Sequence, residues 1–345
     1  MNKFAFLVHP RHSAREDMGK VSPFFLLFPE FILKKIITFL GPIKAGRVKF
    51  ENNKTELIGW IVWIPLLGEQ ILTLPKKIVI VRLVKAIKMM KDLGAKVIGL
   101  GEFTASVTHG GRDLVGLVEG VSITSGNSLT TGVVFRAVEK IIEIKKINTA
   151  EAQVAIVGAA GSIGQGVAEL LIQRGLNVLL VDRPQKSKKL EKRFFSYPKV
   201  RIETDTASIK YADISVIATS SMDQLIRADH LKQNAIIYDI TQPRNTSPEL
   251  LKKRPDATII DGGIVNVPSI DFGVNIGLKR HQAYACLAET MLLAMDENKN
   301  NYVGFTTPEL ARKMLKLMDK YSDQFKIDIY HSFGKKLNGN LILRE

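Results

Sequence analysis

The sequence has one cysteine, few histidines and no long uncharged apolar run. With Cys286 as the only cysteine in 345 residues, an internal disulfide and a cysteine-based zinc site are excluded. The six histidines are scattered, and none forms a spaced metal motif with a carboxylate. The first residues, MNKFAFLVHPRHSARED, lack the layout of a signal peptide, so we expect a cytoplasmic protein.

An apolar stretch near the start, SPFFLLFPEFILKKIITFLGPI (Ser22 to Ile43), raises the question of a membrane. It is interrupted by Pro29, Glu30, Lys34 and Lys35. A spanning helix needs ~20 nearly uncharged residues, so we do not expect this stretch to cross a bilayer. It could lie peripherally on a membrane surface, or it could line a pocket for an apolar molecule.

Acidic residues are outnumbered, since 34 Asp and Glu face 49 Lys and Arg for a net charge of +15. This excess is consistent with a solvated basic surface, and equally with an acidic partner. Such a partner could be nucleic acid, anionic lipid or an acidic carrier protein. The basic clusters lack interleaved aromatics and a nucleic-acid motif, so we do not expect nucleic acid.

The length predicts about two domains, and the pattern predicts an α/β protein. We expect an N-terminal α/β substrate domain over residues 1–135. Within it, LIGWIVWIPLLG (Leu57 to Gly68) reads as a buried strand and turn. LPKKIVIVRLVKAIKMMKDLG reads as a basic amphipathic helix that ends near Gly94, and AKVIGLG as the strand after it.

From about Ala150, short β-branched segments alternate with helices, which is typical of a Rossmann-type doubly wound parallel sheet. These segments are AQVAIVG, LNVLLVD, DISVIAT, NAIIYDI and ATIIDGG. We expect this dinucleotide-binding domain over residues 136–278. Residues 279–345 are predicted to form C-terminal helices that return to the cleft between the domains, including PELARKMLKLMDKYSDQF.

The strongest motif is VAIVGAAGSIGQGVAELL, in which glycines recur at Gly158, Gly161 and Gly164. Glycine lets the backbone turn sharply and approach a pyrophosphate, and the following helix directs its free N–H groups at the phosphates. The motif follows a predicted strand and opens a predicted helix, so it predicts a nicotinamide dinucleotide. The loop residues expected to contact it are Gly158, Ala159, Ala160, Gly161, Ser162, Ile163 and Gly164.

The next strand ends in Asp182 and Arg183, which bear on the choice of nucleotide. Asp182 could bind a ribose 2′-hydroxyl, which favours NAD(H). Arg183 and the following lysines could hold a 2′-phosphate, which favours NADP(H), or could simply form an exposed helix start.

Later strand ends supply further cofactor candidates. Thr219, Ser220 and Gly263 follow predicted parallel strands, where open sheets bind their ligands. The alternative reading is ordinary turn chemistry.

The cysteine lies in HQAYACLAETMLLAM, predicted as a helix from His281 to Met295. One apolar stripe is formed by Tyr284, Leu287, Ala288, Met291, Leu292 and Met295. At ~100° per residue, Cys286 lies roughly 170° from the centre of this stripe, on a mixed face with Gln282, Glu289 and Leu293.

Position alone does not make this thiol reactive. We expect Cys286 to lie about two turns into its helix, where the dipole has faded. Glu289 is expected to disfavour a thiolate. The residues alone leave both a nucleophile and a quiet small side chain open.

The chain resembles the long-chain acyl-(acyl carrier protein) reductases, aldehyde-forming enzymes that feed alkane biosynthesis. The resemblance runs from about Lys54 to Met295 through ordered blocks. They are GLGEFTA, TSGNSLT, VAIVGAAGSIG, DGGIVNV with the following IDF, and QAYACLAETMLL.

The resemblance implies a thioester reduction. In that family a cysteine attacks the acyl thioester, the carrier thiol leaves, and hydride from NADPH yields a free aldehyde. By its place in the QAYAC block, Cys286 matches the family's nucleophile. The resemblance further implies a long-chain acyl substrate, an acidic acyl carrier protein and an aldehyde-consuming partner enzyme. A small neutral residue precedes the cofactor arginine in the family, whereas Asp182 stands here, so NAD(H) remains an alternative to NADP(H).

An oxyanion formed in this reaction needs hydrogen-bond donors. The candidates are Asn127, Ser128 and Thr130 in TSGNSLTTG, and the Gln282 amide. Alternatively, Ser128 or Thr131 could cap the helix that follows.

Two other functions compete with the acyl reductase. One is a dehydrogenase of the shikimate or amino-acid dehydrogenase type, with direct hydride transfer, although its substrate loops need a lysine that GEFTASVTHGG and TSGNSLTTG lack. The other is a basic dinucleotide-binding protein of the membrane surface without catalysis.

Overall fold

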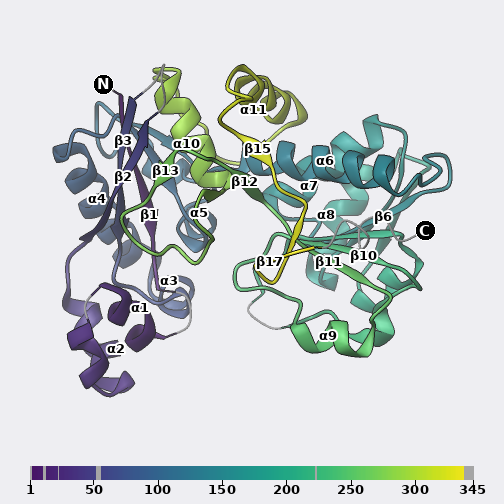
Figure 1. Cartoon of the computed structure of the whole chain (residues 1–345), viewed down its shortest axis with the longest axis horizontal. Coiled ribbons are helices and arrows are strands. Elements are labelled where there is room, and N and C mark those ends of the chain that lie inside the picture. Colours follow the sequence, from purple (N-terminus) through teal and green to yellow (C-terminus); the bar gives the residue numbers. More distant parts are fainter. Residues whose placement is uncertain (1, 11–12, 22, 52–55, 222–223, 338–345) are drawn as a thin grey trace. The chain divides into compact units, whose positions relative to one another are not determined.

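The computed structural model describes residues 2–10, 13–21, 23–51, 56–221 and 224–337 (Figure 1). Ser22, the first residue of the apolar stretch, lies outside them. The chain forms two compact units. The first comprises Met1–Leu129, Asn266–Phe305 and Leu317–Lys326, and the second Thr130–Val265, Thr306–Lys316 and Ile327–Glu345.

The first unit is built on a sheet with the strand order β13-β2-β3-β1-β4-β5. Its strands are β1 (Asn2–Val8), β2 (Ile43–Glu51), β3 (Glu56–Trp63), β4 (Val97–Leu100), β5 (Ser122–Thr124) and β13 (Ile270–Asp271). β3, β1, β4 and β5 run parallel, and β2 runs antiparallel to β3. The carboxyl ends of four parallel strands therefore meet at one edge of the sheet.

Helices cover both faces of this sheet. α4 (Lys76–Asp92) packs its buried stripe, Val79 to Met90, against the face that includes Leu7. α10 (Ala285–Met295) contacts β1 and β4 on the other face, where Gly99 and Phe6 point, because successive strand residues alternate between faces. The remaining helices are α1 (Ala14–Val21), η1 (Pro23–Leu27), α2 (Glu30–Phe39), α3 (Gly68–Thr73), α5 (Phe103–Val107) and η2 (Arg112–Leu114).

The second unit has an all-parallel sheet in the order β11-β10-β9-β6-β7-β8. Its strands are β6 (Gln153–Val157), β7 (Asn177–Val181), β8 (Val200–Glu203), β9 (Ile214–Ile217), β10 (Ile236–Asp239) and β11 (Thr258–Asp261). The chain runs outward from β6 in one direction and then from β9 in the other, which is the doubly wound dinucleotide-binding order. The predicted fold class is confirmed.

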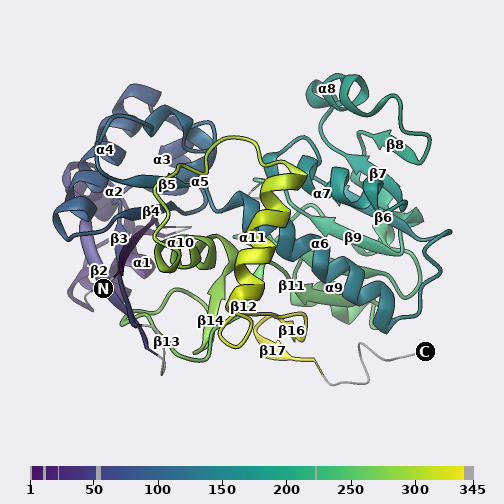
Figure 2. The same cartoon turned by 90° about the horizontal axis from the view of Figure 1, so that it is seen from above.

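The second unit also contains several helices. They are α7 (Ser162–Gln173), α8 (Pro184–Phe194), η3 (Thr206–Tyr211), η4 (Ala228–His230), α9 (Pro248–Lys253), and most of α6 (Asn127–Ile144) and of α11 (Pro308–Lys320). α6 and α7 lie beside the strand β6 (Figure 2). Buried side chains of the three elements share one core. Short strands complete the chain: β12 (Ile264–Asn266), β14 (Gln282–Tyr284), β15 (Lys326–Ile327), β16 (His331–Ser332) and β17 (Lys335–Lys336).

Several predicted elements occur as expected. Leu57 begins the buried part of β3, and the basic helix is α4, ended by Gly94 with its φ of 89°. The tail helix stops at Lys320, earlier than predicted. Among the described residues, no helix combines the length and the apolar character that crossing a bilayer requires.

The unit boundaries differ from the predicted residues 135 and 278. The first unit ends after Leu129, and it takes up residues 266–305 again. α10 therefore belongs to the first unit, because its apolar side chains complete the core against β1 and β4.

Candidate active site

The residues at the carboxyl edge of the first sheet form the candidate site. His9 follows β1, Glu102 follows β4, and Gly126 follows β5. α10 runs toward this edge with its N-terminus, because a Cβ on Gly99 of β4 would lie 2.0 Å from Thr290 Oγ1 and a Cβ on Gly126 would lie 2.2 Å from Cys286 Cβ. The edge thus gathers strand ends and one thiol, as expected for a ligand site of a parallel sheet.

Cys286 lies in the first turn of α10, which corrects the predicted position two turns into the helix. The helix begins at Ala285, and Gln282–Tyr284 forms the strand β14 instead. Tyr284 has extended backbone angles (φ −67°, ψ 144°) and no capping side chain, so the sequence carries no signal for this boundary. The first-turn N–H groups have no partner within their helix, and Cys286, a partly exposed residue, lies among them.

The resting cysteine is a thiol rather than a thiolate. Burial raises the pKa of the Cys286 side chain to about 12, and the Glu102 carboxylate adds to this shift. The N–H groups of Leu287 and of Cys286 itself donate toward the sulfur and lower the pKa in part. Attack on a substrate therefore requires a group that accepts the thiol proton.

Glu289 does not lie on a mixed, accessible face as predicted, because every residue of α10 except Cys286 is buried and the Glu289 side chain has 0% exposure. Its carboxylate accepts hydrogen bonds from the Leu129 N–H at 2.6 Å and from the Thr124 hydroxyl. It thereby caps the N-terminus of α6 from a neighbouring helix. Burial raises the pKa of Glu289 to about 7, although these donors oppose the shift.

A pair formed by the buried His9 and the partly buried Glu102 lies at the same edge, and the sequence did not predict it. His9 Nε2 is 3.2 Å from Glu102 Oε2, His9 Nδ1 is 2.8 Å from the Pro10 carbonyl oxygen, and Phe103 stacks on the imidazole. Glu102 has φ 49° and ψ −124°, a conformation that costs a non-glycine residue about 1–3 kcal/mol. No spacing rule links the pair, because its members follow different strands.

The predicted oxyanion donors occupy different places. Asn127 and Ser128 begin α6 beside Gly126, so they lie at the edge with the thiol. Thr130 is buried within α6 and belongs to the second unit. Gln282 lies on β14, not one helical turn before the cysteine, and its Oε1 accepts the Lys279 N–H at 3.3 Å.

The alternative reading of Ser128 or Thr131 as a helix cap is wrong. Both residues lie inside α6, which begins at Asn127. The Glu289 carboxylate supplies the cap. Thr131 instead packs against Gly166 of α7 within the second unit.

The glycine loop lies between β6 and α7, where the strand order of the second unit reverses. Gly158 has φ 85°, and a Cβ there would lie 2.7 Å from the Ala218 carbonyl oxygen and from the Thr219 backbone. A Cβ on Gly164 would lie 2.5 Å from the Gly158 carbonyl oxygen. Only glycine fits these positions, and the loop presents the N-terminus of α7 to a pyrophosphate.

The remaining loop positions fit the same ligand. Ala159 and Ala160 are small and buried, while Ser162 and Ile163 open α7 with Gly161 before them as the N-cap. The Ser162 hydroxyl oxygen accepts the Thr306 N–H at 3.0 Å.

Asp182 ties this loop to the end of β7. One oxygen of its carboxylate accepts the Ala160 N–H at 2.8 Å, and the other accepts the Arg183 N–H at 2.8 Å. Arg183 is exposed at the N-cap of α8. Arg183 therefore follows the carboxylate that contacts the loop, and its side chain is accessible to a ligand.

The strand-end candidates Thr219, Ser220 and Gly263 lie in the second unit. Thr219 adjoins Gly158 at the point where the strand order reverses, and its hydroxyl oxygen accepts the Ser221 N–H at 3.1 Å. Ser220 is exposed next to it. Gly263, with φ 67°, follows β11 at the far edge, and its N–H donates to the Tyr238 hydroxyl.

The second unit, which carries the glycine loop, is similar to a known protein family. Residues 138–261 match the family described as shikimate / quinate 5-dehydrogenase. Aminotransferase PigE of a Serratia species is 29% identical over 254 residues, 71% of this chain but 29% of PigE. The chain therefore spans less than a third of that relative.

Two further proteins share more of their length with this chain. The long-chain acyl-[acyl-carrier-protein] reductase of Synechococcus elongatus is 26% identical over 236 residues, which cover 64% of this chain and 68% of that protein. The crystal structure of shikimate dehydrogenase from Aquifex aeolicus is 12% identical, with a TM-score of 0.39 over 92% of this chain and 98% of that one.

The glycine loop, the strand order and the family match agree with one another. The second unit is therefore a shikimate-dehydrogenase-like nucleotide unit that suits a nicotinamide dinucleotide. The predicted class of cofactor, a nicotinamide dinucleotide, is confirmed.

Proposed function

We propose that this oxidoreductase reduces a long-chain fatty acyl thioester to the fatty aldehyde through an acyl-cysteine on Cys286. The observation that carries the proposal is the place of the only thiol, in the first turn of α10 and against Gly126 at the start of α6. The similarity to an acyl-[acyl-carrier-protein] reductase supports the same reaction.

The Cys286 sulfur attacks the thioester carbonyl carbon, and the carbon–sulfur bond to the carrier breaks. Acyl exchange between two sulfurs is nearly balanced in free energy, so a thiolate suits this substrate. The carbonyl oxygen carries negative charge as the new bond forms. The N–H groups of Cys286 and Leu287, which already point toward the sulfur, and the nearby Asn127 are the donors we assign to this oxygen.

The pair of Glu102 and His9 accepts the thiol proton and returns it to the departing carrier thiolate. Glu102 is close enough to the sulfur to raise its pKa, and His9 Nε2 lies 3.2 Å from the carboxylate. A proton moving from sulfur to this pair removes the repulsion between the carboxylate and the forming thiolate. The proposed role of Glu102 in proton transfer accounts for its strained backbone conformation.

The second unit holds the cofactor through the glycine loop from Gly158 to Gly164, with Thr219 beside it. When bound, NADPH would supply the hydride that reduces the acyl-cysteine. The carbon–sulfur bond to Cys286 then breaks, the aldehyde leaves, and the sulfur regains a proton from solvent. The Asp182 carboxylate accepts the Ala160 and Arg183 N–H groups and holds the loop, while the exposed Arg183 can bind a 2′-phosphate. We therefore propose NADP(H) over NAD(H), as the sequence resemblance implies.

The substrate is delivered as a thioester of an acidic acyl carrier protein or of coenzyme A. A net charge of +15 favours such carriers. Because the proposed product is a fatty aldehyde, we propose an aldehyde-consuming enzyme as a partner.

The experiment that tests the proposal uses a long-chain acyl-CoA without reductant, followed by intact-mass measurement. We expect one acyl adduct that maps to Cys286 and is released as aldehyde when NADPH is added. Cys286→Ala should form no adduct and no aldehyde, while it keeps its fold and its NADPH affinity. The chain has no second cysteine, so an adduct in this variant would contradict the proposal.

A second candidate is a dehydrogenase that transfers hydride directly to a carbonyl without a covalent step. The match of residues 138–261 to the shikimate / quinate 5-dehydrogenase family favours it. Turnover that survives Cys286→Ala would support this alternative over the acyl reductase.

A further inference from the structure

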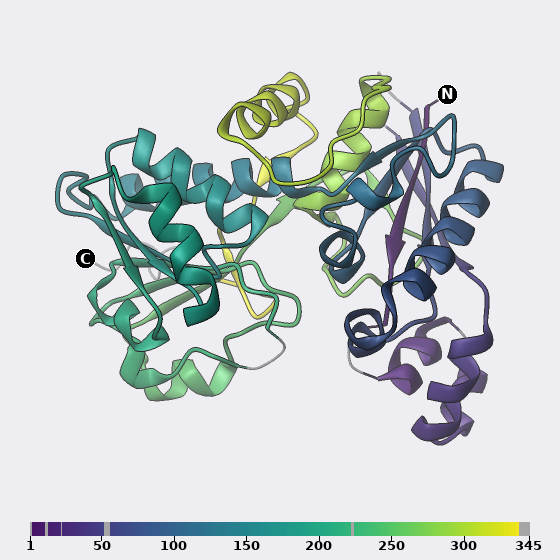
Figure 3. The same cartoon turned by 180° about the vertical axis from the view of Figure 1, so that it is seen from behind.

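The segment between β1 and β2 exposes large apolar side chains. Within η1 and α2, the exposed fraction is 59% for Phe24, 78% for Leu27, 66% for Phe31 and 88% for Phe39. Helical segments of soluble proteins normally turn such side chains inward. The segment lies at the end of the first unit toward which β1 runs (Figures 1 and 3).

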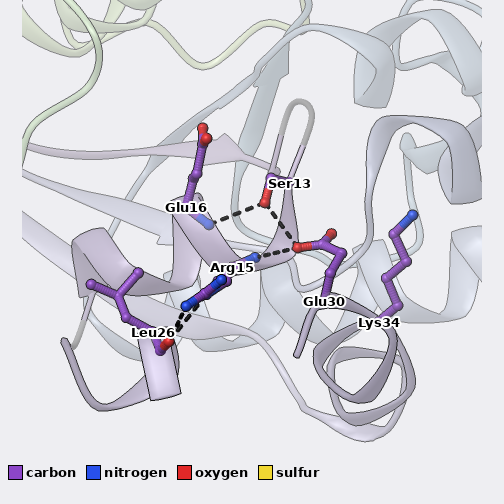
Figure 4. Close-up of a pocket in the computed structure, with 6 residues that line it drawn as sticks. All are labelled: Ser13, Arg15, Glu16, Leu26, Glu30 and Lys34. Carbon is purple, nitrogen blue, oxygen red and sulfur yellow. Dashed lines mark hydrogen bonds between the residues drawn. The ribbon is translucent and has the colours of Figure 1, made fainter. Parts of the chain in front are cut away.

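The helices of this segment are joined to one another through polar contacts. Glu30 accepts hydrogen bonds from the Ser13 hydroxyl and the Ala14 N–H, both at 2.9 Å, and caps the start of α1. The Arg15 guanidinium donates to the Leu26 carbonyl oxygen at 2.7 and 3.0 Å (Figure 4). These contacts join the helices without the side chains of Leu27, Phe31 and Phe39, whereas Phe24 also packs on Phe25 and Phe28.

The inner face of α2 makes the core contacts that the fold needs. Leu33 and Ile37 are fully buried and cluster with Trp63, Leu67 and Ala14. At 3.6 residues per turn, Phe31, Lys35 and Phe39 then share the opposite side of the helix. The exposed side chains are thus an addition to a helix that is already anchored.

The exposed charged side chains of η1 and α2 are positive. Lys34 and Lys35 are exposed on α2. Glu30 is the only acidic residue in η1 and α2. Partial burial would raise its pKa, but hydrogen bonds from the Arg15 and Ala14 N–H groups hold its pKa below the usual value. The carboxylate is therefore committed to the cap of α1.

We propose that η1 and α2 dock on the surface of an anionic lipid bilayer, with Phe24, Leu27, Phe31 and Phe39 inserted at the headgroup level. Exposed aromatic and leucine side chains beside lysines are typical of helices that lie in the membrane interface. Protein–protein interfaces, in contrast, are depleted in lysine. The proposal does not depend on the proposed reaction.

The placement of this surface bears on substrate access. The segment starts after the carboxyl end of β1, beside His9, and returns through β2 at the edge where β3 ends. This is the sheet edge that carries Cys286. Docking would therefore bring the candidate site of the first unit near the lipid phase, into which long acyl chains partition.

The test measures co-sedimentation with vesicles of phosphatidylcholine and phosphatidylglycerol, and with vesicles of phosphatidylcholine alone. We expect binding to the anionic vesicles. The triple variant Leu27→Ser, Phe31→Ser, Phe39→Ser should bind at least about tenfold more weakly. Lys34→Glu with Lys35→Glu should lose at least about fivefold in affinity for the anionic vesicles only.

Phe195→Ser is the matched control, because Phe195 at the end of α8 in the second unit is 84% exposed. It should bind vesicles as the unaltered protein does. Equal binding by the control and both surface variants would overturn the proposal, as would no binding of the unaltered protein to anionic vesicles. A dimer that only the triple variant abolishes, without vesicle binding, would assign the surface to a second copy. Turnover of a short, water-soluble acyl thioester should be unchanged in the surface variants, and it reports on the proposed reaction separately.

Discussion

Gly126 shows how closely the site residues are packed at the scale of single side chains. Its φ of 73° disfavours any Cβ, and a Cβ there would lie 2.2 Å from Cys286 Cβ. Gly120 is the matched control, since its φ is 76° but the nearest atoms to a Cβ are 3.9 Å away. Gly120→Ala should cost about 1 kcal/mol of unfolding free energy from backbone strain alone.

Gly126→Ala should cost at least about 2 kcal/mol more, because α10 or the start of α6 must move. It should slow acylation of Cys286 at least about tenfold. Denaturant unfolding and the rate of adduct formation measure the two effects. Equal behaviour of the two variants would show that the contact between Gly126 and Cys286 is not tight.

The Cys286 thiol should react with iodoacetamide at a rate that still increases above pH 10, because its pKa is raised to about 12. Glu102→Gln removes a nearby negative charge, so alkylation at pH 8 should become a few times faster. Acylation by an acyl thioester should instead become about a hundredfold slower, because the proton acceptor is gone.

These opposite changes separate a proton acceptor from a residue that only shapes the pocket. Glu119→Gln, an exposed carboxylate outside the site, is the control and should change neither rate. If both rates fall together in Glu102→Gln, the assigned role of Glu102 is wrong.

Glu289 makes stability depend on pH. Its pKa is about 7 in the folded protein and near 4.5 in the unfolded chain, so the folded state binds the proton more tightly. The contribution is fully present below pH 4.5 and is lost as the pH rises through about 7, by an amount on the order of 3 kcal/mol.

Glu289→Gln should remove this slope, while it weakens the cap of α6. The measurement is the difference in unfolding free energy between the unaltered protein and the variant from pH 4 to pH 8. The difference is the informative quantity because burial also raises the pKa of Asp239. A difference that does not vary with pH would contradict the assignment.

At the scale of helices and strands, the sequence was most informative where patterns are local. Alternating β-branched segments predicted β6, β7, β9, β10 and β11, and the glycine spacing predicted the turn into α7. The start of α10 could not be predicted, because Gln282–Tyr284 is apolar enough to continue a helix and Tyr284 carries no capping group. The predicted helix began about one turn too early. Cys286 was therefore expected well inside the helix, whereas it lies in the first turn, where free N–H groups lower a thiol pKa.

The role of Glu289 and the pairing of His9 with Glu102 depend on contacts between distant segments. Glu289 reads as a solvent-facing residue until α6 is seen to place its N-terminus against it. His9 and Glu102 meet because β1 and β4 are neighbours, a fact of strand order that no local pattern contains.

The hairpin of β16 and β17 depends on one carboxylate at the end of β11. Asp261 accepts the Phe333 N–H at 2.9 Å and the Gly334 N–H at 2.7 Å, and it pairs with Arg244 at 2.9 Å. Asp261→Ala leaves these donors without an acceptor, each at about 1–3 kcal/mol. We expect faster hydrogen exchange at residues 331–336, with the glycine loop unchanged. Unchanged exchange in the hairpin would show that other contacts hold it.

At the scale of the whole molecule, the sequence predicted an α/β protein of two parts but not how the chain alternates between them. The chain passes from the first unit to the second within the start of α6, and it returns for α10. A linear division into consecutive domains cannot describe this, because the segment that completes the first core comes late in the sequence.

The net charge of +15 leads to a prediction about substrate delivery under the proposed function. An acyl carrier protein is acidic, so its encounter with this protein should be accelerated by long-range attraction, which salt screens within ~10 Å at 0.1 M. The kcat/KM for an acyl-carrier thioester should therefore fall at least about tenfold between low salt and ~0.5 M salt. An uncharged N-acetylcysteamine thioester with the same acyl chain should change less than about twofold, because it presents the same carbonyl to Cys286 without the charged carrier. Steady-state rates for the two substrates over one salt series provide the comparison. A parallel decrease for both would mean that salt acts on the chemical step or on cofactor binding, and that the basic surface does not select an acidic carrier.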